Sequence, residues 1–369
     1  MKTYAAEREF ILLSLDQLSL ADFQYFLTSG FVIQRPIGCE IWLGIGLNED
    51  PAGIFITHSF YNNQLKRFNP TKLIKTTIDE FEAYCSLFFT EKLGLEPLSD
   101  DDEDFCLDLE QILDWFKIDQ KLLKVVAVTT CTYKLTNNAH PLSQLSSMQK
   151  LEGSVYGFWD KGRGVIGVSP EPLFMKEGIM QGKESWMTRS LAGTISCESE
   201  QHRDTILNDP KEIIEHNLVT KDIIEKLTPY VFEIKAEKTK VVPFGKIAHL
   251  QTNLSFLASH LSASKLMMIL GPTAALGGFP QSLSSQYLRK LNYYQQEKEE
   301  RQFGGSIGFE YEDEAFALVG IRNLYWDSTS KKGIIHSGGG IVKESMIENE
   351  LNEVRSKREV IRSLFDSHA

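Results

Sequence analysis

Two pairs of glutamates stand at the same spacing in two distant parts of the chain. Glu212 and Glu215 are three residues apart, and so are Glu350 and Glu353. If each pair lies on a helix, its two carboxylates share one helical face. Either pair alone is most often a solvated face. Two pairs facing one cleft would repel each other unless a cation lay between them, and oxygen ligands without histidine or cysteine favour Mg²⁺.

A lysine and a third glutamate could supply acid–base chemistry. Lys124 opens a β-branched segment that predicts a strand. A lysine in this position usually extends its amine to solvent. In a closed site, desolvation would instead lower its pKa and let it act as a base. Glu171 stands between Pro170 and Pro172, so its backbone is restrained, which suits an oriented acid as well as a simple turn.

Three consecutive glycines, residues 338–340, precede the second glutamate pair. Each glycine carries an entropy cost inside a strand or helix, so an irregular segment that passes close to a ligand is predicted. Ser345 is predicted to cap the helix that follows, and Lys357 lies one turn beyond the glutamates. His249 ends another predicted strand and is interpreted as a structural residue.

The elements that must position these residues follow from hydrophobic periodicity. Strands are predicted near residues 31–33, 41–47, 53–57, 124–130, 155–168 (a hairpin), 190–195, 241–251, 303–309, 316–326 and 333–336. Helices are predicted over residues 74–95, 107–122, 210–227 and 283–302, and a charged loop over 99–104. Strand-rich blocks interrupted by single helices indicate an α+β fold with large antiparallel sheets.

The composition excludes several classes of protein. The chain has 369 residues and a net charge of −11 without a basic stripe, which argues against binding nucleic acid. The longest apolar run, residues 266–280, is too short and too rich in glycine to span a bilayer, so no membrane association is expected. The N-terminus carries charges within its apolar pattern, unlike a signal peptide. Five scattered cysteines argue against disulfides and zinc, and a cytoplasmic location is expected.

Taken together, these segments resemble the chorismate-utilising enzymes, the family of isochorismate, salicylate, anthranilate and aminodeoxychorismate synthases. The motifs occur in the family's order: Lys124-Val-Val, Ser169-Pro-Glu, Leu191-Ala-Gly-Thr, Glu212-x-x-Glu215-His216, residues 272–280, Glu300-Arg-Gln-Phe-Gly-Gly, Ile321-Arg322, and residues 338–342 through Glu350-x-x-Glu353 to Lys357. They fall within residues 120–365, and residues 1–115 are less recognisable. The resemblance implies one catalytic domain over residues 1–369, an α+β fold of two large packed antiparallel sheets with helices outside.

The resemblance also implies roles for individual residues. Glu215 and Glu353 would bind Mg²⁺, with Glu212 and Glu350 as nearby or water-bridged partners. The substrate, chorismate, would be bound by Gly193, Thr194, Ala275, Leu276, Phe303, Arg322, Gly338, Gly339, Gly340 and Lys357, with backbone N–H groups assisting. A glutamine amidotransferase subunit is not expected.

Within the family, Lys124 and Glu171 favour the members that use water. Adding water to C2 of chorismate while the C4 hydroxyl leaves needs a base and an acid. Ala192 stands where aminodeoxychorismate synthases commonly have a nucleophilic lysine, and Phe303 stands where salicylate synthases usually have tyrosine. The sequence therefore favours isochorismate synthase, an isomerase of menaquinone or siderophore biosynthesis.

Two alternatives stay open: a salicylate synthase, which would go on to eliminate pyruvate, and a chorismate-binding protein with weakened catalysis. The second draws on the first two of three departures from the family pattern. Gly271 replaces a common histidine, residues 195–197 (Ile-Ser-Cys) replace common basic residues, and Met346-Ile347 replaces Asp-Pro.

Overall fold

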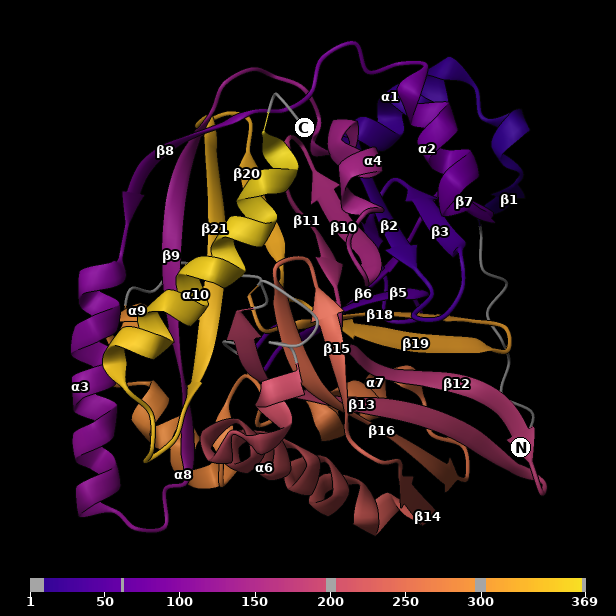
Figure 1. The fold of residues 1–369 in the computed structure, drawn as a ribbon. Helices are drawn as coiled ribbons and strands as arrows, with labels where there is room; N and C mark the ends of the chain where they lie inside the picture. The colour runs from indigo at the N-terminus through magenta and orange to yellow at the C-terminus, as the bar shows by residue number, and fades with distance from the viewer. Residues whose placement is uncertain (1–9, 61–62, 197–203, 296–302, 367–369) are drawn as a thin grey trace.

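The structure is a computed structural model that describes residues 10–60, 63–196, 204–295 and 303–366. Over these residues the chain forms two large β-sheets with helices on their outer sides (Figure 1). The predicted α+β class with two packed sheets is therefore confirmed. Among the described strands, only β1 and β7 pair in parallel, and every other pair is antiparallel.

The larger sheet has eleven of the described strands. In spatial order they are β1 (Ile11–Leu13), β7 (Lys72–Thr77), β3 (Glu40–Ile45), β2 (Ser29–Gln34), β10 (Ser154–Asp160), β11 (Arg163–Ser169), β20 (Asn323–Asp327), β21 (Lys332–Ile341), β9 (Lys124–Leu135) and β17 (Gly278–Phe279), with β8 (Leu95–Asp100) paired to the far half of β9. The predicted hairpin of residues 155–168 is β10 and β11, which is confirmed.

The second sheet has ten described strands. In spatial order they are β14 (Val231–Ala236), β16 (Ile247–Ala258), β13 (Lys183–Ser196), β12 (Pro172–Met180), β19 (Glu314–Val319), β18 (Ser306–Tyr311), β5 (Phe55–His58), β6 (Leu65–Asn69) and β4 (Asn48–Glu49), with β15 (Lys240–Phe244) paired to β16. Most strands that precede residue 115 extend one edge of each sheet, and β8 is the exception, since it pairs with β9 near the other end of the larger sheet. One domain over the whole chain stays a prediction.

Aromatic side chains fill the space where the two sheets face each other. Phe31 of β2 stacks on Phe55 of β5 with ring centroids 4.2 Å apart. Trp42 of β3 stacks on Phe309 of β18 at 4.8 Å. Such pairs contribute about 0.5–1.5 kcal/mol each beyond the apolar area that they bury, so this packing holds the two sheets against each other.

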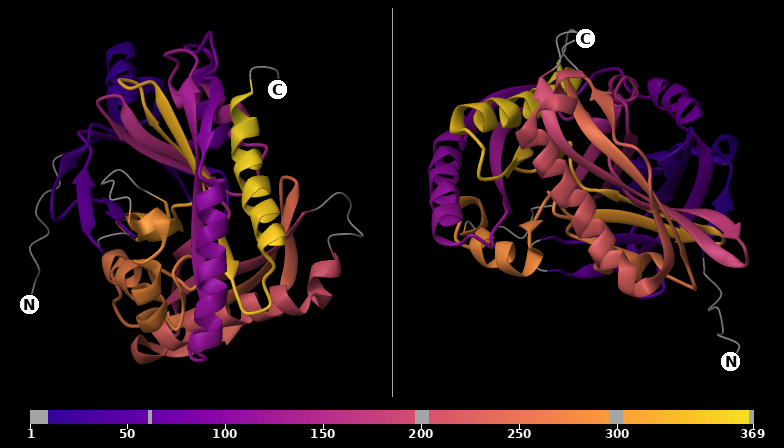
Figure 2. Two further views of the ribbon diagram at one scale, coloured as in Figure 1. Left: turned by 90° about the vertical axis from the view of Figure 1, so that its left-hand side faces the viewer. Right: turned by 60° about the horizontal axis from the view of Figure 1, so that its bottom comes forward.

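Helices cover the outer sides of both sheets (Figure 2). They are α1 (Leu20–Thr28), α2 (Ile78–Ser86), α3 (Asp102–Ile118), α4 (Leu145–Met148), α6 (Pro210–Leu227), α7 (Ala263–Leu270), α8 (Gln281–Leu288), α9 (Asn292–Gln295) and α10 (Ile347–Arg362). Helix α6 lies along β13 and β16, whereas α10 packs on β21 beside α3. Helix α10 also contacts β13, so the two helices that carry the glutamate pairs approach each other.

Several element boundaries differ from the predictions because local turn and capping chemistry outweighs periodicity. The helix predicted from residue 74 begins at Ile78, where Thr77 and Glu80 form a capping box. The charged loop predicted at 99–104 is wrong, since β8 runs to Asp100 and α3 begins at Asp102. The strand predicted at 241–251 is divided between β15 and β16, and the strand at 316–326 between β19 and β20. The helix predicted at 283–302 is divided into α8 and α9, and its last residues lie outside the described ranges.

Two predictions near the second glutamate pair are wrong. Residues 338–340 are regular strand within β21, paired with residues 126–128 of β9. Met346, not Ser345, is the N-cap residue of α10. Ser345 instead accepts a hydrogen bond from the Val342 N–H through its Oγ at 3.1 Å, which closes the turn between β21 and the helix.

The described cysteines, Cys39, Cys85, Cys106 and Cys131, carry free thiols. Within the described ranges, none of the helices combines the length and the apolar composition that crossing a membrane requires.

Candidate active site

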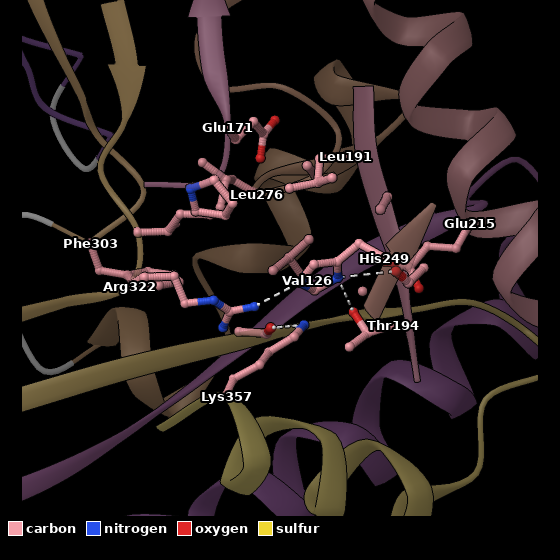
Figure 3. Close-up of a pocket in the computed structure, with 17 residues that line it drawn as sticks. Val126, Glu171, Leu191, Thr194, Glu215, His249, Leu276, Phe303, Arg322 and Lys357 are labelled. Atoms are coloured by element: carbon pink, nitrogen blue, oxygen red, sulfur yellow. Dashed lines mark hydrogen bonds between the residues drawn. The ribbon is translucent and has the colours of Figure 1, made fainter. Parts of the chain in front are cut away.

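A cavity lies where the two sheets meet the loop of residues 271–277 and helices α6 and α10 (Figure 3). About 560 Å³ of space there is not filled by protein atoms, counting the part open to solvent. Eleven of the sixteen predicted site residues line it: Glu171, Gly193, Thr194, Glu215, Ala275, Leu276, Phe303, Arg322, Gly338, Gly340 and Lys357. The other five do not: Lys124, Glu212, Gly339, Glu350 and Glu353.

Two cavity side chains lie on segments where the chain passes from one sheet to the other. Glu171 follows β11 of the larger sheet and precedes β12 of the second, and Arg322 lies on the return from β19 to β20. The two crossings are bonded to each other. The Val319 N–H donates to the Glu171 carbonyl at 3.0 Å, and Ser169 Oγ donates to the Val319 carbonyl at 2.8 Å. Both sheets therefore determine where these side chains lie.

The Glu171 carboxyl is held in its neutral form. Its side chain is buried, and no described residue hydrogen-bonds to its Oε1. Burial raises the pKa of Glu171 to about 8, and the charges of Lys124, Arg189 and Arg322 offset only part of this effect. At neutral pH the carboxyl therefore carries a proton that it can donate into the cavity.

His249, on β16, forms part of the cavity wall between Arg322 and Thr194. Arg322 Nη2 donates to His249 Nε2 at 3.2 Å, so the ring hydrogen lies on Nδ1, which is 3.2 Å from the Gly193 carbonyl and 3.0 Å from Thr194 Oγ1. Burial keeps the pKa of His249 well below its usual value, and the charge of Arg322 lowers it further. The imidazole is thus neutral and orients Arg322. The interpretation of His249 as purely structural missed its place in this wall.

Arg322 itself is held in a strained position. Its φ of 57° lies in the left-handed region, which costs a non-glycine residue about 1–3 kcal/mol. Its side chain is buried, and burial lowers the pKa of the guanidinium to about 10. The group still carries its charge at neutral pH, and its Nε has no hydrogen-bond partner among the described residues. A buried cation with a free donor suits an anionic ligand.

A β-bulge at Gly193 joins the cavity to helix α6. The register of β13 against β16 shifts between Ala192 and Thr194, and Gly193 has a φ of 78°. The bulge directs the Thr194 N–H at Glu212, whose Oε2 accepts it at 2.7 Å. This N–H was predicted to assist substrate binding, but in the structure it holds a glutamate.

The four predicted metal ligands, two each from α6 and α10, do converge, but a lysine that was not predicted lies between them. Lys211 Nζ is 3.1 Å from Glu212 Oε1, from Glu215 Oε2 and from Glu350 Oε1, and 3.8 Å from Glu353 Oε2. The carboxylates border a groove beside the cavity, lined in part by Glu212, Glu350 and Glu353. Lys211 and the four glutamates, Glu212, Glu215, Glu350 and Glu353, are called the carboxylate cluster below.

Two more ammonium groups flank the carboxylate cluster. Lys124 is fully buried, and its Nζ donates to Glu215 Oε1 at 3.0 Å. Lys357 Nζ donates to Glu353 and to the Gly338 carbonyl, the latter at 2.9 Å. Burial acts to raise the pKa of Glu215, but Lys124, Lys211 and Lys357 together outweigh it and lower that pKa.

Comparison with known proteins identifies the family. Residues 71–365 match the family model described as "Chorismate binding enzyme". The chain belongs to this family. Isochorismate synthase MenF of Pasteurella multocida is 26% identical over 312 residues, which are 82% of this chain and 71% of that protein. The protein of the same name from Haemophilus influenzae is 26% identical over 254 residues, 66% of this chain and 56% of that one.

A solved structure supports the fold of this chorismate-binding enzyme. The menaquinone-specific isochorismate synthase MenF from Escherichia coli superposes with a TM-score of 0.78, covering 96% of this chain and 93% of the other. The sequence identity over that superposition is 18%, so the likeness establishes the fold. The predicted family is therefore confirmed, and the reaction has to be argued from the site.

The donor set of the carboxylate cluster fits the magnesium ion that the family implies. It offers only carboxylate oxygens, the ligands that a hard divalent cation prefers. Glu350 is buried, and its Oε2 has no hydrogen-bond partner among the described residues. With Lys211 between them, however, the side chains that the structure describes form no group ready to hold a metal. A metal would therefore have to displace Lys211.

Gly340 is where strand β21 of this chorismate-binding enzyme passes closest to the cluster. Gly338 and Gly340 line the cavity, whereas Gly339 faces Glu350 on α10, as the alternation of a strand requires. A Cβ at Gly340 would overlap Glu215 Oε1 and lie 2.5 Å from Lys124 Cε. The segment was predicted to pass close to a ligand, and in the structure it passes close to the ion pair of Lys124 and Glu215.

We expect Gly340→Ala to lower the free energy of unfolding by about 1–3 kcal/mol, because the new methyl group has no room. Displacing Glu215 and Lys124 by a few tenths of an ångström should also reduce turnover, by roughly 10-fold. Gly339→Ala is the matched control, since its nearest new contacts would be ordinary ones at 3.4 Å. Thermal unfolding and steady-state kinetics of both variants check this, and equal behaviour of the two would contradict it.

The departures from the family pattern have different surroundings. A Cβ at Gly271 would lie 2.8 Å from the Met267 carbonyl and 3.1 Å from Nδ1 of His58, so a histidine there would press against the His58 ring. Ile195 lines the groove beside the carboxylate cluster. Met346 caps α10 without a side-chain hydrogen bond. Cys197 and the motif residues 300–302 lie outside the described ranges.

Proposed function

We propose that this chorismate-binding enzyme is an isochorismate synthase, an isomerase that adds water to C2 of chorismate as the hydroxyl leaves C4. The observation that carries the proposal is the buried carboxyl of Glu171, whose Oε1 has no hydrogen-bond partner among the described residues and which lines the same cavity as Arg322 and Lys357. Burial raises its pKa to about 8, which favours the protonated form at neutral pH. A hydroxyl is a poor leaving group unless it receives a proton, and this carboxyl is the proton donor that the reaction needs.

Arg322 and Lys357 would bind the two carboxylates of chorismate. Figure 3 shows both cations on the side of the cavity away from the Glu171 carboxyl. Arg322 is oriented by His249, and Lys357 by Glu353 and the Gly338 carbonyl. A dianion gripped there would have its ring directed towards Glu171, because fixed charges orient a substrate as well as bind it.

Glu215 and Glu353 would hold Mg²⁺, with Glu212 and Glu350 beside them. When bound, the ion would supply positive charge for a substrate carboxylate and balance the glutamates. The chain's own residues carry the proton transfers. Lys124, which is paired as an ammonium with Glu215 here, would first have to release its own proton. Its amine would then accept a proton from the attacking water, and Glu171 would donate one to the departing hydroxyl. One water enters and one leaves, so the enolpyruvyl group stays intact.

Product analysis tests the proposed function. The full chain is incubated with chorismate and Mg²⁺, and the products are separated by chromatography. We expect isochorismate, because the Glu171 acid lines the cavity and the Lys124 amine lies directly behind Glu215, which lines it too. Salicylate with pyruvate would instead identify a salicylate synthase. Calorimetric binding of chorismate without its consumption would identify a binding protein with weakened catalysis.

A further inference from the structure

Lys211 has a setting unlike that of any ordinary surface lysine. It is the second residue of α6, directly after Pro210, and its side chain is 14% exposed. Its single ammonium contacts four carboxylates from two helices that are far apart in sequence. The Asp209 side chain, which accepts from the Lys211 N–H at 2.9 Å, fixes the first turn and thereby the start of this side chain.

Without Lys211, the carboxylate cluster would lack charge balance. Four carboxylates would face only Lys124 and Lys357, each of which is bonded mainly to one glutamate. Buried charges of the same sign repel each other strongly, and burying a charge that has no partner of opposite sign is costly. Lys211 therefore holds α6 and α10 together at this point when no other cation is present.

A divalent cation and the Lys211 ammonium cannot share this position. Mg²⁺ binds carboxylate oxygens at about 2.0–2.1 Å, whereas the ammonium sits 3.1 Å from three of the oxygens concerned. Two cations a few ångströms apart also repel. Lys211 has somewhere to go, because its flexible stem lines the groove beside the cluster, whose walls include the additional acidic residues Asp209 and Glu344.

We propose that Lys211 is an internal competitor of the divalent metal: its ammonium holds the four glutamates together in the metal-free enzyme and has to withdraw before a metal binds. The inference rests on the metal role given to these glutamates in the proposed function. It adds that the affinity for the metal is set partly by a side chain that is not a ligand. If the form in which Lys211 has withdrawn is only a small fraction of the molecules, the apparent Kd for the metal equals the intrinsic Kd divided by that fraction.

The test titrates Mg²⁺ alone into the metal-free full chain by calorimetry, without chorismate, and follows thermal unfolding with and without the ion. We expect Lys211→Met to bind Mg²⁺ at least about 10-fold more tightly than the wild type, since the competitor is removed. Its metal-free form should unfold at a lower temperature, and Mg²⁺ should raise its Tm by more than it raises that of the wild type. Lys221→Met, on the exposed face of the same helix, is the control and should behave as the wild type.

Unchanged or weaker binding of Mg²⁺ by Lys211→Met would overturn the proposal, because Lys211 would then be positioning the glutamates for the metal. If that variant folds only when Mg²⁺ is present, the proposal is supported. Lys211→Arg keeps the positive charge, so its Kd should not fall below that of the wild type, and tighter binding by this variant would refute competition even if Lys211→Met does not fold. Because chorismate is absent, these results stand apart from the test of the isomerase activity.

Discussion

Replacing Glu171 by glutamine should lower kcat by at least about 100-fold, the contribution expected of a positioned general acid. Glutamine has nearly the same shape and is uncharged, as the buried carboxyl is at neutral pH, so the fold and the binding of chorismate should persist. The glutamine amide, however, has no acidic proton to give to the departing hydroxyl. Steady-state kinetics measure the loss of kcat, and calorimetry with chorismate measures whether binding persists. Glu184→Gln, at a glutamate paired with Lys176 away from the cavity, is the control.

The pH dependence of turnover by the wild type and by Glu171→Gln gives a second test of the same role. The pKa of Glu171 is raised by burial to about 8, so the acid is protonated below that pH and ionised above it. Turnover by the wild type should therefore fall as the pH rises through about 8, and the remaining activity of Glu171→Gln should lack this descending limb. If Glu171→Gln kept normal turnover, or if both proteins had the same alkaline limb, another group would have to be the acid.

Replacing Lys124 by glutamine should also cost at least about 100-fold in kcat, through loss of the base that takes the proton from water. The Lys124 side chain is fully buried, and its Nζ bonds to Glu215 Oε1. The amide of glutamine can still donate to that oxygen, which preserves the packing but not the basicity. Formation of isochorismate is the measurement, with circular dichroism to confirm the fold.

Two comparisons make the result for Lys124 interpretable. Lys176→Gln removes a lysine from another Lys–Glu pair, 3.2 Å long and outside the cavity, and should leave turnover unchanged. In the Lys124→Gln/Glu171→Gln double variant, the two losses should be less than additive in free energy if acid and base act as a unit. Near-normal turnover by Lys124→Gln would exclude the lysine as the base.

The part of the site that the sequence could predict is the part that depends on local spacing. Glu212 with Glu215, and Glu350 with Glu353, face one place because three-residue spacing on a helix defines one face, and four carboxylates then require a cation. Lys211 was missed although its signal was local. It stands four residues before Glu215, a helical spacing at which opposite charges pair.

The part that could not be predicted depends on contacts between distant strands. The place of His249 follows from its pairing opposite Thr194 across β13 and β16, together with a bulge at Gly193 that changes the register. The hydrophobic periodicity of a single strand predicts neither which residue lies opposite it nor where a bulge shifts the register. The three glycines were likewise judged by their backbone cost, whereas in β21 that cost is outweighed by ten residues of pairing with β9 and by the need for close approach at Gly340.

The two crossings that carry Glu171 and Arg322 limit how a cavity of this design can be remodelled. Each is anchored in both sheets and bonded to the other crossing, so an insertion in either would shift strand register on two sides at once. The loop of residues 271–277 lies outside the ladders of both sheets and is bonded to α6 only in its first half, at Pro272 and Ala274. Engineering a different ring-shaped ligand into this scaffold should therefore begin at Ala275 and Leu276, where length and bulk can change while the proton donor and the guanidinium keep their separation.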